Sequence, residues 1–211
     1  MHPLTQLIYH DMKPALGVTE PGAIAFAVAK AKAQIGGTVE LVELRLNSGM
    51  YKNAFTCGIP GSTQVGNLYA AALGATGADA QKGLECLDGI TDAQHKQTQQ
   101  LVDQGKVRAE MSEVTSRIYI EAGVTTDQGN ATVIIRDSHT NITEIRVNGD
   151  TVFLAQAEEI QDDGDLAAPI HSYTLAQLVD YAQTVDLEEI AFVEEAYTTN
   201  LALFEEGLGS S

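Results

Sequence analysis

A run of small apolar residues near the N-terminus constrains the fold more than any other stretch of this chain. Residues 15–29 read ALGVTEPGAIAFAVA, and the alanine-rich part continues to Ala33, just before a pair of glycines. Thr19 is the predicted N-cap, with Glu20 and Pro21 at the first helical positions. Because such small side chains let another backbone approach closely, we expect a helix that is covered on both faces.

The first turn of this helix leaves two interpretations open. The backbone amides of Thr19, Glu20 and Gly22 would lie at its positive end, where a carboxylate or another anionic ligand binds favourably. An ordinary capped helix of the core needs no ligand, and it is the simpler interpretation of the residues alone.

Short helices and one strand are predicted over the rest of the first half. Residues 38–46 read TVELVELRL and alternate with a period of two, which indicates a strand with one buried face. Val39, Leu41 and Leu44 fit that face only approximately, so the pattern admits a bulge. Helices are expected at residues 3–14, 65–75, 79–87 and 91–104.

The periodicity changes to that of strands at residue 106. Four β-rich runs separated by turn residues extend to residue 156, and Asn148-Gly149 is a strong signal for a two-residue hairpin. An antiparallel meander of about 50 to 60 residues accounts for this pattern. After it we expect an acidic surface loop at 157–169 and two helices, the first capped by Thr174 and the second running from Leu187 onward. The second has an apolar stripe interpreted as core: Ile190, Val193, Tyr197, Leu201 and Phe204.

These elements predict an α+β fold in which small-residue helices flank an antiparallel β-meander, with two C-terminal helices. The length of 211 residues favours one domain. Within it, residues 1–105 are mainly helical, residues 106–156 form the β unit, and residues 157–211 hold the acidic loop and the last helices.

Charge and cysteine content argue against some classes of partner and site. The 12 basic and 29 acidic residues give a formal net charge of −17, which disfavours nucleic-acid binding. We expect no membrane segment and, because residues 1–10 lack the features of a signal peptide, a cytoplasmic location. Cys57 and Cys86 are far from any zinc spacing, so neither a closed metal site nor a disulfide framework is predicted.

Residues 47–62 read NSGMYKNAFTCGIPGS and are predicted to form a loop whose backbone amides face a ligand. They lack the glycine spacing and the lysine of a phosphate-binding loop. Lys52 and Asn53 could bind a substrate carboxylate, and the alternative is a turn held by Asx and hydroxyl side chains. His139 lies in a later turn, where the spacing identifies no partner for it, so an ordinary turn residue is expected.

Five motifs carry a resemblance to a known family. They are ALGVTEPGAIAFAVAKA, SGMYKNAFTCGIPGS, AALGATGADAQKGLE, SHTNI and NLALFEEGL. Over nearly all its length the chain resembles the N-terminal half of the L-cysteine desulfidase and serine dehydratase alpha-chain-like family. The collinear order of the motifs makes this resemblance more specific than any one of them.

The resemblance implies one partial catalytic-type domain of an iron-sulfur lyase. Such enzymes eliminate water from L-serine, or hydrogen sulfide from L-cysteine, and give pyruvate and ammonia. Family members are similar in holding a 4Fe-4S cluster by three cysteines, which leaves one iron open to act as a Lewis acid. The first of these cysteines lies in a run ALGCTEP, and Val18, which has no donor atom, stands at that position here.

The cluster is therefore expected to be absent from this chain, and the isolated chain to be inactive. The other two cluster cysteines belong to the family's C-terminal half, and Cys57 is interpreted as a buried small hydrophobe. By the resemblance, the predicted substrate-binding residues are those that match family motifs: Thr19, Glu20, Lys52, Asn53, His139, Thr140 and Asn141.

Two functions of different classes follow from these motifs. In the first, the chain is the N-terminal portion of a serine dehydratase or cysteine desulfidase-like lyase. In the second, it is a non-catalytic module that binds a small molecule or docks a partner. The expected partners are a small amino acid and either a C-terminal-half protein or a second copy of the chain, because the apolar stripe near the C-terminus still needs cover. A purely structural protein is the weaker, third alternative.

Overall fold

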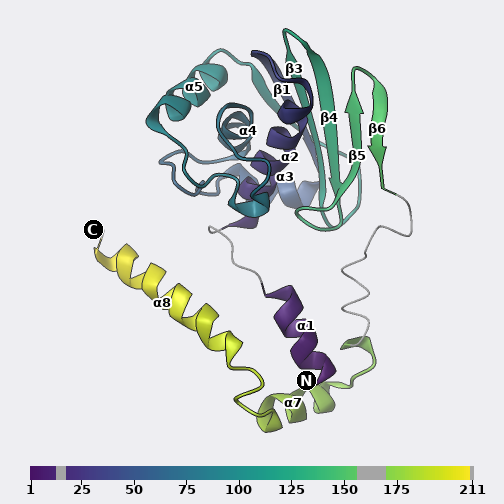
Figure 1. Cartoon of the computed structure of the whole chain (residues 1–211), viewed down its shortest axis with the longest axis vertical. Coiled ribbons are helices and arrows are strands. Elements are labelled where there is room, and N and C mark those ends of the chain that lie inside the picture. The colour runs from purple at the N-terminus through teal and green to yellow at the C-terminus, as the bar shows by residue number, and fades with distance from the viewer. Residues whose placement is uncertain (13–17, 156–169, 210–211) are drawn as a thin grey trace. The chain divides into compact units, whose positions relative to one another are not determined.

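The computed structural model describes residues 1–12, 18–155 and 170–209 (Figure 1). The chain divides into two compact units, Ala15–Ile160 and a smaller one that combines Met1–Pro14 with Gln161–Ser211. The acidic loop predicted at 157–169 lies outside the described residues. The predicted α+β fold is confirmed, with helices, a mainly antiparallel sheet and helices at the C-terminal end.

The larger unit contains a six-stranded sheet in the order β2-β1-β3-β4-β5-β6. Its last four strands form the predicted antiparallel meander, and the Asn148-Gly149 turn joins the last two. The bounds are β1 Val39–Leu46, β2 Val107–Met111, β3 Tyr119–Thr126, β4 Gly129–Arg136, β5 Ile142–Val147 and β6 Asp150–Leu154.

One strand lies outside this meander, contrary to expectation. β2 pairs in parallel with β1, and β1 separates it from β3. A parallel pair needs a long crossover, which the helices between residues 48 and 103 provide. Strand periodicity identifies β2 as a strand but contains no information about this non-local partner.

The helices of the larger unit cover one face of its sheet (Figure 1). They are α2 Thr19–Ile35, α3 Ser48–Phe55, α4 Asn67–Thr76 and α5 Asp92–Asp103, with a 3-10 turn at Gly83–Glu85. α2 lies at the centre, where it contacts α4 and strands β3 and β4. Its sequence of small residues packs closely: a Cβ on Gly74 of α4 would lie 2.6 Å from the carbonyl oxygen of Ala25.

The small-residue helix is confirmed, but its predicted N-cap is wrong. Val18 is the N-cap and makes no side-chain capping bond, whereas Thr19 is the first helical residue. The Thr19 hydroxyl bonds to other side chains instead of the helix amides, which accounts for the shift. The helix ends where expected, at Gly36, which has a φ of 64° that favours glycine.

Two other local predictions are wrong. The expected loop at 47–62 contains α3, because Met50 and Ala54, four residues apart, both pack into the core. The expected helix at 79–87 is reduced to the short 3-10 turn, since Gly83 has a φ of 56°, outside the helical region.

Strand β1 has the bulge that its pattern admits, between Val39 and Leu41. Beyond the bulge the buried face consists of Val42, Leu44 and Leu46, which corrects the face predicted for this strand. Leu41 lies three residues before Leu44, and residues at an odd spacing point to opposite faces of a strand, so the two cannot share the buried face.

The smaller unit contains α1 (Pro3–Asp11), α7 (Leu175–Thr184) and α8 (Phe192–Gly209). Thr5 of α1 hydrogen-bonds through Oγ1 to the Tyr181 hydroxyl and to Glu189 Oε1, both at 2.7 Å. The predicted cap of α7 is confirmed: Thr174 forms a capping box with Gln177. No described helix is long and apolar enough to cross a membrane.

The last helix differs from its prediction in two ways. α8 begins at Phe192, since residues 187–191 form turns, and none of its described residues is buried. Four of the five residues of the stripe interpreted as core lie on α8 and are exposed, with Tyr197 at 68% and Phe204 at 61%. The fifth, Ile190, lies in the preceding turn and is half-buried. No described part of the smaller unit covers the stripe on α8.

Candidate functional site

A row of hydrogen-bonded side chains joins three segments that are far apart in the sequence. Asn53 of α3 donates from Nδ2 to Glu20 Oε1 at 3.1 Å. Glu20 Oε2 lies 3.5 Å from the Thr19 hydroxyl, which is 3.3 Å from Nε2 of His139 in the turn between β4 and β5. This turn lies 120 residues beyond Thr19 in sequence, so only the fold brings them together.

The row has a consistent assignment of protons. A neutral His139 that carries its proton on Nε2 donates to Thr19 Oγ1, whose own proton is then available to Glu20. Burial lowers the pKa of His139 below its ordinary value of 6.5, and the positive charge of Arg117 lowers it further, while Glu20 opposes both effects. The imidazole is thus neutral near pH 7 and able to accept a proton.

The first turn of α2 adds backbone donors beside this row. Val18 provides no side-chain cap for the first amides of the helix. Unsatisfied amides and the helix dipole together favour an anion at such a position. The arrangement therefore combines a helix start suited to a carboxylate with a carboxylate of its own, Glu20, suited to a cation.

The structure brings four of the seven predicted site residues together. Those are Thr19, Glu20, Asn53 and His139. Lys52 is exposed on α3, next to Asn53 in sequence, and Thr140 is exposed in the β4–β5 turn. Asn141 donates from Nδ2 to the carbonyl oxygen of Arg136 at 3.1 Å, so it closes its own turn.

Two residues near the row were not predicted. Arg117 acts on His139 through its charge. Cys57 is half-buried, not buried as expected, and its Sγ donates to the carbonyl oxygen of Asn53 at 2.6 Å. Cys57 follows the end of α3, and its contact with Asn53 depends on that helix, which the loop predicted at 47–62 does not contain.

Comparisons with known proteins find relatives of this chain. A UPF0597 protein of Clostridium botulinum strain Langeland is 34% identical over 210 residues, which cover 97% of this chain and 49% of the relative. Another, from Shewanella sp. strain ANA-3, is 36% identical over 203 residues, and one from Photobacterium profundum is 35% identical over 202 residues. The chain is similar to UPF0597 proteins.

This similarity covers almost the whole chain but only part of each relative. The chain spans about half the length of the curated relatives it matches, 47–49% of those named. No family model matches the chain, and no solved structure does.

The described residues of this chain do not by themselves fit an iron-sulfur cluster. Such clusters are held by cysteine thiolates. Val18 has no donor, and burial raises the pKa of Cys86 to about 12, so its thiol stays protonated 3.5 Å from the carbonyl oxygen of Gly22. In the ranges that the structure describes, no three His, Cys, Asp or Glu side chains gather closely enough to hold a metal ion.

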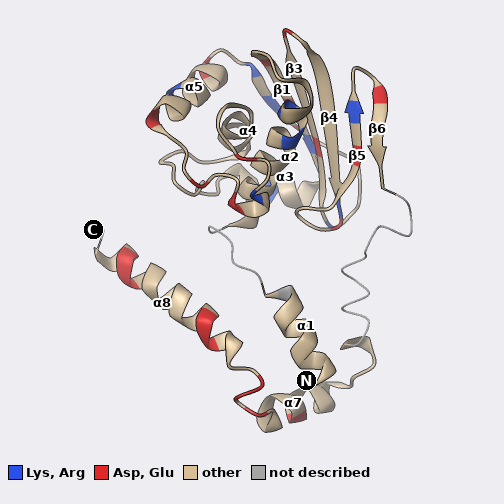
Figure 2. Cartoon of the chain, in the orientation of Figure 1, with Lys and Arg blue, Asp and Glu red and all other residues tan. Residues whose placement is uncertain are grey.

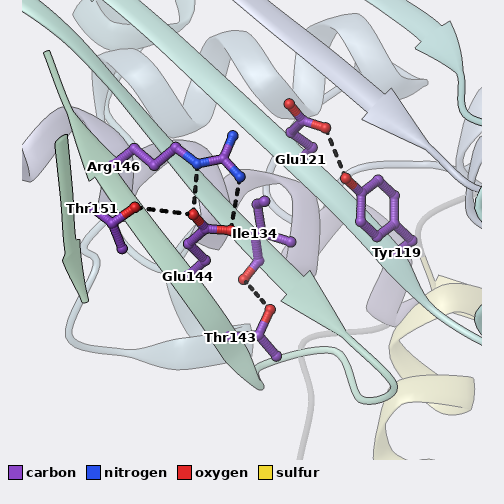
Figure 3. A network of polar contacts seen from close by, with 7 residues as sticks. All are labelled: Tyr119, Glu121, Ile134, Thr143, Glu144, Arg146 and Thr151. Atoms are coloured by element: carbon purple, nitrogen blue, oxygen red, sulfur yellow. Dashed lines mark hydrogen bonds and ion pairs between the residues drawn. The ribbon is translucent and has the colours of Figure 1, made fainter. Parts of the chain in front are cut away.

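A second polar network lies on the face of the sheet opposite the helices (Figure 3). Arg146 pairs with Glu144 at 2.6 and 2.8 Å, and the Tyr119 hydroxyl donates to Glu121 Oε2 at 2.7 Å. Burial, and then the bond to Glu121, raises the pKa of Tyr119 to about 12. Each of these pairs joins two residues of one strand, and the Thr151 hydroxyl of β6 also donates to Glu144 Oε1 of β5 at 3.3 Å. The groups are therefore partnered within the sheet, and the network is no candidate for a ligand site.

Proposed function

We propose that this chain is the amino-acid-binding, N-terminal half of a lyase of the L-serine dehydratase or L-cysteine desulfidase type, and that it is inactive alone. The observation that carries the proposal is the row Asn53–Glu20–Thr19–His139 at the start of α2. The similarity to UPF0597 proteins of about twice the length supports the view that a second half completes the site.

Each group of the row has a role in holding an amino acid. The first amides of α2 bind its carboxylate, and Glu20 accepts hydrogen bonds from its ammonium group. Asn53 fixes the Glu20 carboxylate from the other side. Neutral His139, held by Thr19, faces the bound molecule as a proton acceptor. No elimination step is assigned to the chain, since its residues do not fit the cluster.

Val18 favours a second candidate function, a non-catalytic module that binds a small amino acid or docks a partner. This module would keep the helix start and the row while lacking the cluster ligand. Both candidates predict amino-acid binding. They differ when the remaining half of a UPF0597 relative is added under anaerobic conditions with iron and sulfide, because only the first then predicts pyruvate. A cytoplasmic location is part of both proposals.

Thermal unfolding and a pyruvate assay test the proposal on the full chain. We expect L-serine or L-cysteine to raise the melting temperature of the wild-type chain, but not that of Glu20→Gln. Glu40→Gln, an exposed change on β1 beyond the C-terminal end of α2, is the matched control and should keep the shift. Pyruvate formed by the isolated chain would contradict the proposed inactivity, and equal shifts for both variants would exclude the row as the binding site.

A further inference from the structure

Strand β2 has one unpaired edge. On its paired side, the Val42 amide donates to the carbonyl oxygen of Lys106 at 2.8 Å, and the Ser112 amide donates to Leu46 at 2.7 Å. Even-numbered residues of β2 therefore bond to β1, so the amides and carbonyls of the odd-numbered ones point the other way. No described strand pairs with that side. Such an edge is a template for another strand.

An apolar groove of about 520 Å³ borders this edge, between β2 and the ends of α3 and α4. Its lining includes Phe55, Val65 and Leu68, which are 59%, 51% and 37% exposed. Met111, at the end of β2, is 64% exposed. Exposed apolar side chains beside unpaired backbone groups indicate a surface that another chain covers.

The sequence of β2 is complementary to itself in the antiparallel direction. When two copies pair about Ala109, Arg108 lies opposite Glu110 of the second copy and the reverse pair forms by symmetry. Val107 then lies opposite Met111 of the second copy, so the apolar groups also meet. Residues 107, 109 and 111 are those whose backbone groups face outward, and this register bonds them to one another.

We propose that a second copy of this chain adds antiparallel to the edge of β2, about a two-fold axis at Ala109, and joins the two sheets into one. The net charge of the larger unit is small enough that two copies of it can approach each other. Of the 12 lysines and arginines, 11 lie within residues 18–155 and none follows Arg146. Figure 2 shows the smaller unit with acidic residues and no Lys or Arg among those described, so the sheet unit contains most of the basic residues and only part of the excess negative charge.

The other edge of the sheet also exposes apolar side chains, at Val152, Phe153 and Leu154, but it lacks the complementary charges of β2. β6 has a register shift opposite Ile145 and Arg146, and a bulge of this kind protects an edge. Antiparallel pairing of two β6 strands about Val152 would put Thr151 opposite Phe153, without complementary charges. We therefore expect a second copy to pair with the β2 edge and not with the β6 edge.

Sedimentation of the full chain over a range of concentrations tests the interface. We expect a dimer, and a monomer for Ala109→Pro. Proline at this position removes an outward amide and leaves the ladder to β1 intact, as edge prolines do. Val152→Pro on the other edge is the matched control and should still dimerise. Circular dichroism verifies that each variant is folded.

A charge exchange tests the register and does not depend on proline. Arg108→Glu alone should raise the dimer dissociation constant by roughly tenfold, since two symmetric attractions become repulsions. Adding Glu110→Arg should restore it. Lys96→Glu, the same change of charge at an exposed position of α5, should leave the dimer unchanged.

Three results would overturn the proposal: a wild-type monomer at all concentrations, a dimer that persists in folded Ala109→Pro, or no restoration in the double variant. A dimer lost instead with Phe204→Asp would assign self-association to α8.

Discussion

Helices α2 and α8 are the two longest of the described chain, with 17 and 18 residues, and their surroundings are opposite. Both are rich in apolar residues. In α2 nearly every residue from Pro21 to Ala31 is buried, whereas α8 has no buried residue among those described. The sizes of the side chains differ as well: alanine dominates in α2, and leucine, phenylalanine and tyrosine form the stripe of α8.

The difference shows that apolar content alone does not determine burial. Small side chains let α2 touch α4 backbone to backbone, as at Gly74, so the helix is enclosed by its own unit. The large residues of α8 need a complementary surface, and its own unit offers none in the described ranges. Substitutions at matched positions of the two helices test this contrast.

The largest difference is expected from truncating one apolar residue in each helix. Ile24 of α2 is fully buried, so Ile24→Ala should lower the free energy of unfolding by about 2–5 kcal/mol through lost contacts and a cavity. Leu201→Ala on α8, where the side chain is 39% exposed, should change it by less than about 1 kcal/mol. Urea unfolding measures both. Equal losses would contradict the contrast.

Glycine substitutions should have opposite signs in the two regions. Gly74→Ala places a Cβ 2.6 Å from a backbone oxygen, and we expect a loss of about 1–3 kcal/mol. No atom lies within 4 Å of a Cβ at Gly207 on α8, so Gly207→Ala should stabilise its helix by about 0.5–1 kcal/mol. Thermal unfolding gives the sign of each change. A stabilised Gly74→Ala would show that α2 and α4 are not in close contact.

Two equivalent capping boxes allow a finer comparison between the units. Thr91 caps α5 in the larger unit and Thr174 caps α7 in the smaller one, each with a glutamine three residues later. Alanine at either position should cost about 1 kcal/mol. Amide exchange should accelerate in α5 after Thr91→Ala and in α7 after Thr174→Ala. Faster exchange throughout both units after one change would show that they unfold together.

The smallest effect concerns the pH dependence set by His139. Its pKa is lowered in the folded chain, so the unfolded chain binds the proton more strongly. Stability should therefore be constant above the ordinary pKa of 6.5 and fall as the pH decreases from 6.5 to the lowered value. His139→Gln should remove this slope. A slope unchanged in that variant would assign it to another group.

Local features of the fold were predictable from the sequence, and non-local ones were not. The helix of α2, the Asn148-Gly149 hairpin and the cap at Thr174 each depend on neighbouring residues. The parallel pairing of β2 with β1 depends on a crossover of some 60 residues, which periodicity does not specify. α3 was missed because its glycine and asparagines resemble a loop, although Met50 and Ala54 have helical spacing.

The candidate site shows the same division. Motif resemblance identified Thr19, Glu20, Asn53 and His139, but nothing in their spacing indicated that they form one row. The row exists because α3 and the β4–β5 turn both reach the start of α2. Lys52 and Thr140 were predicted on equal grounds and are exposed residues of the same segments, but no hydrogen bond of the described residues joins either of them to the row.

The central claim is that the start of α2, with Glu20 and His139, binds an amino acid. A titration of the isotopically labelled full chain with L-serine, followed by NMR, tests it most directly. The account predicts saturable shifts of the Thr19, Glu20, Asn53 and His139 amides, which disappear in Glu20→Gln. Saturable shifts confined to other residues, or none at any L-serine concentration, would contradict it.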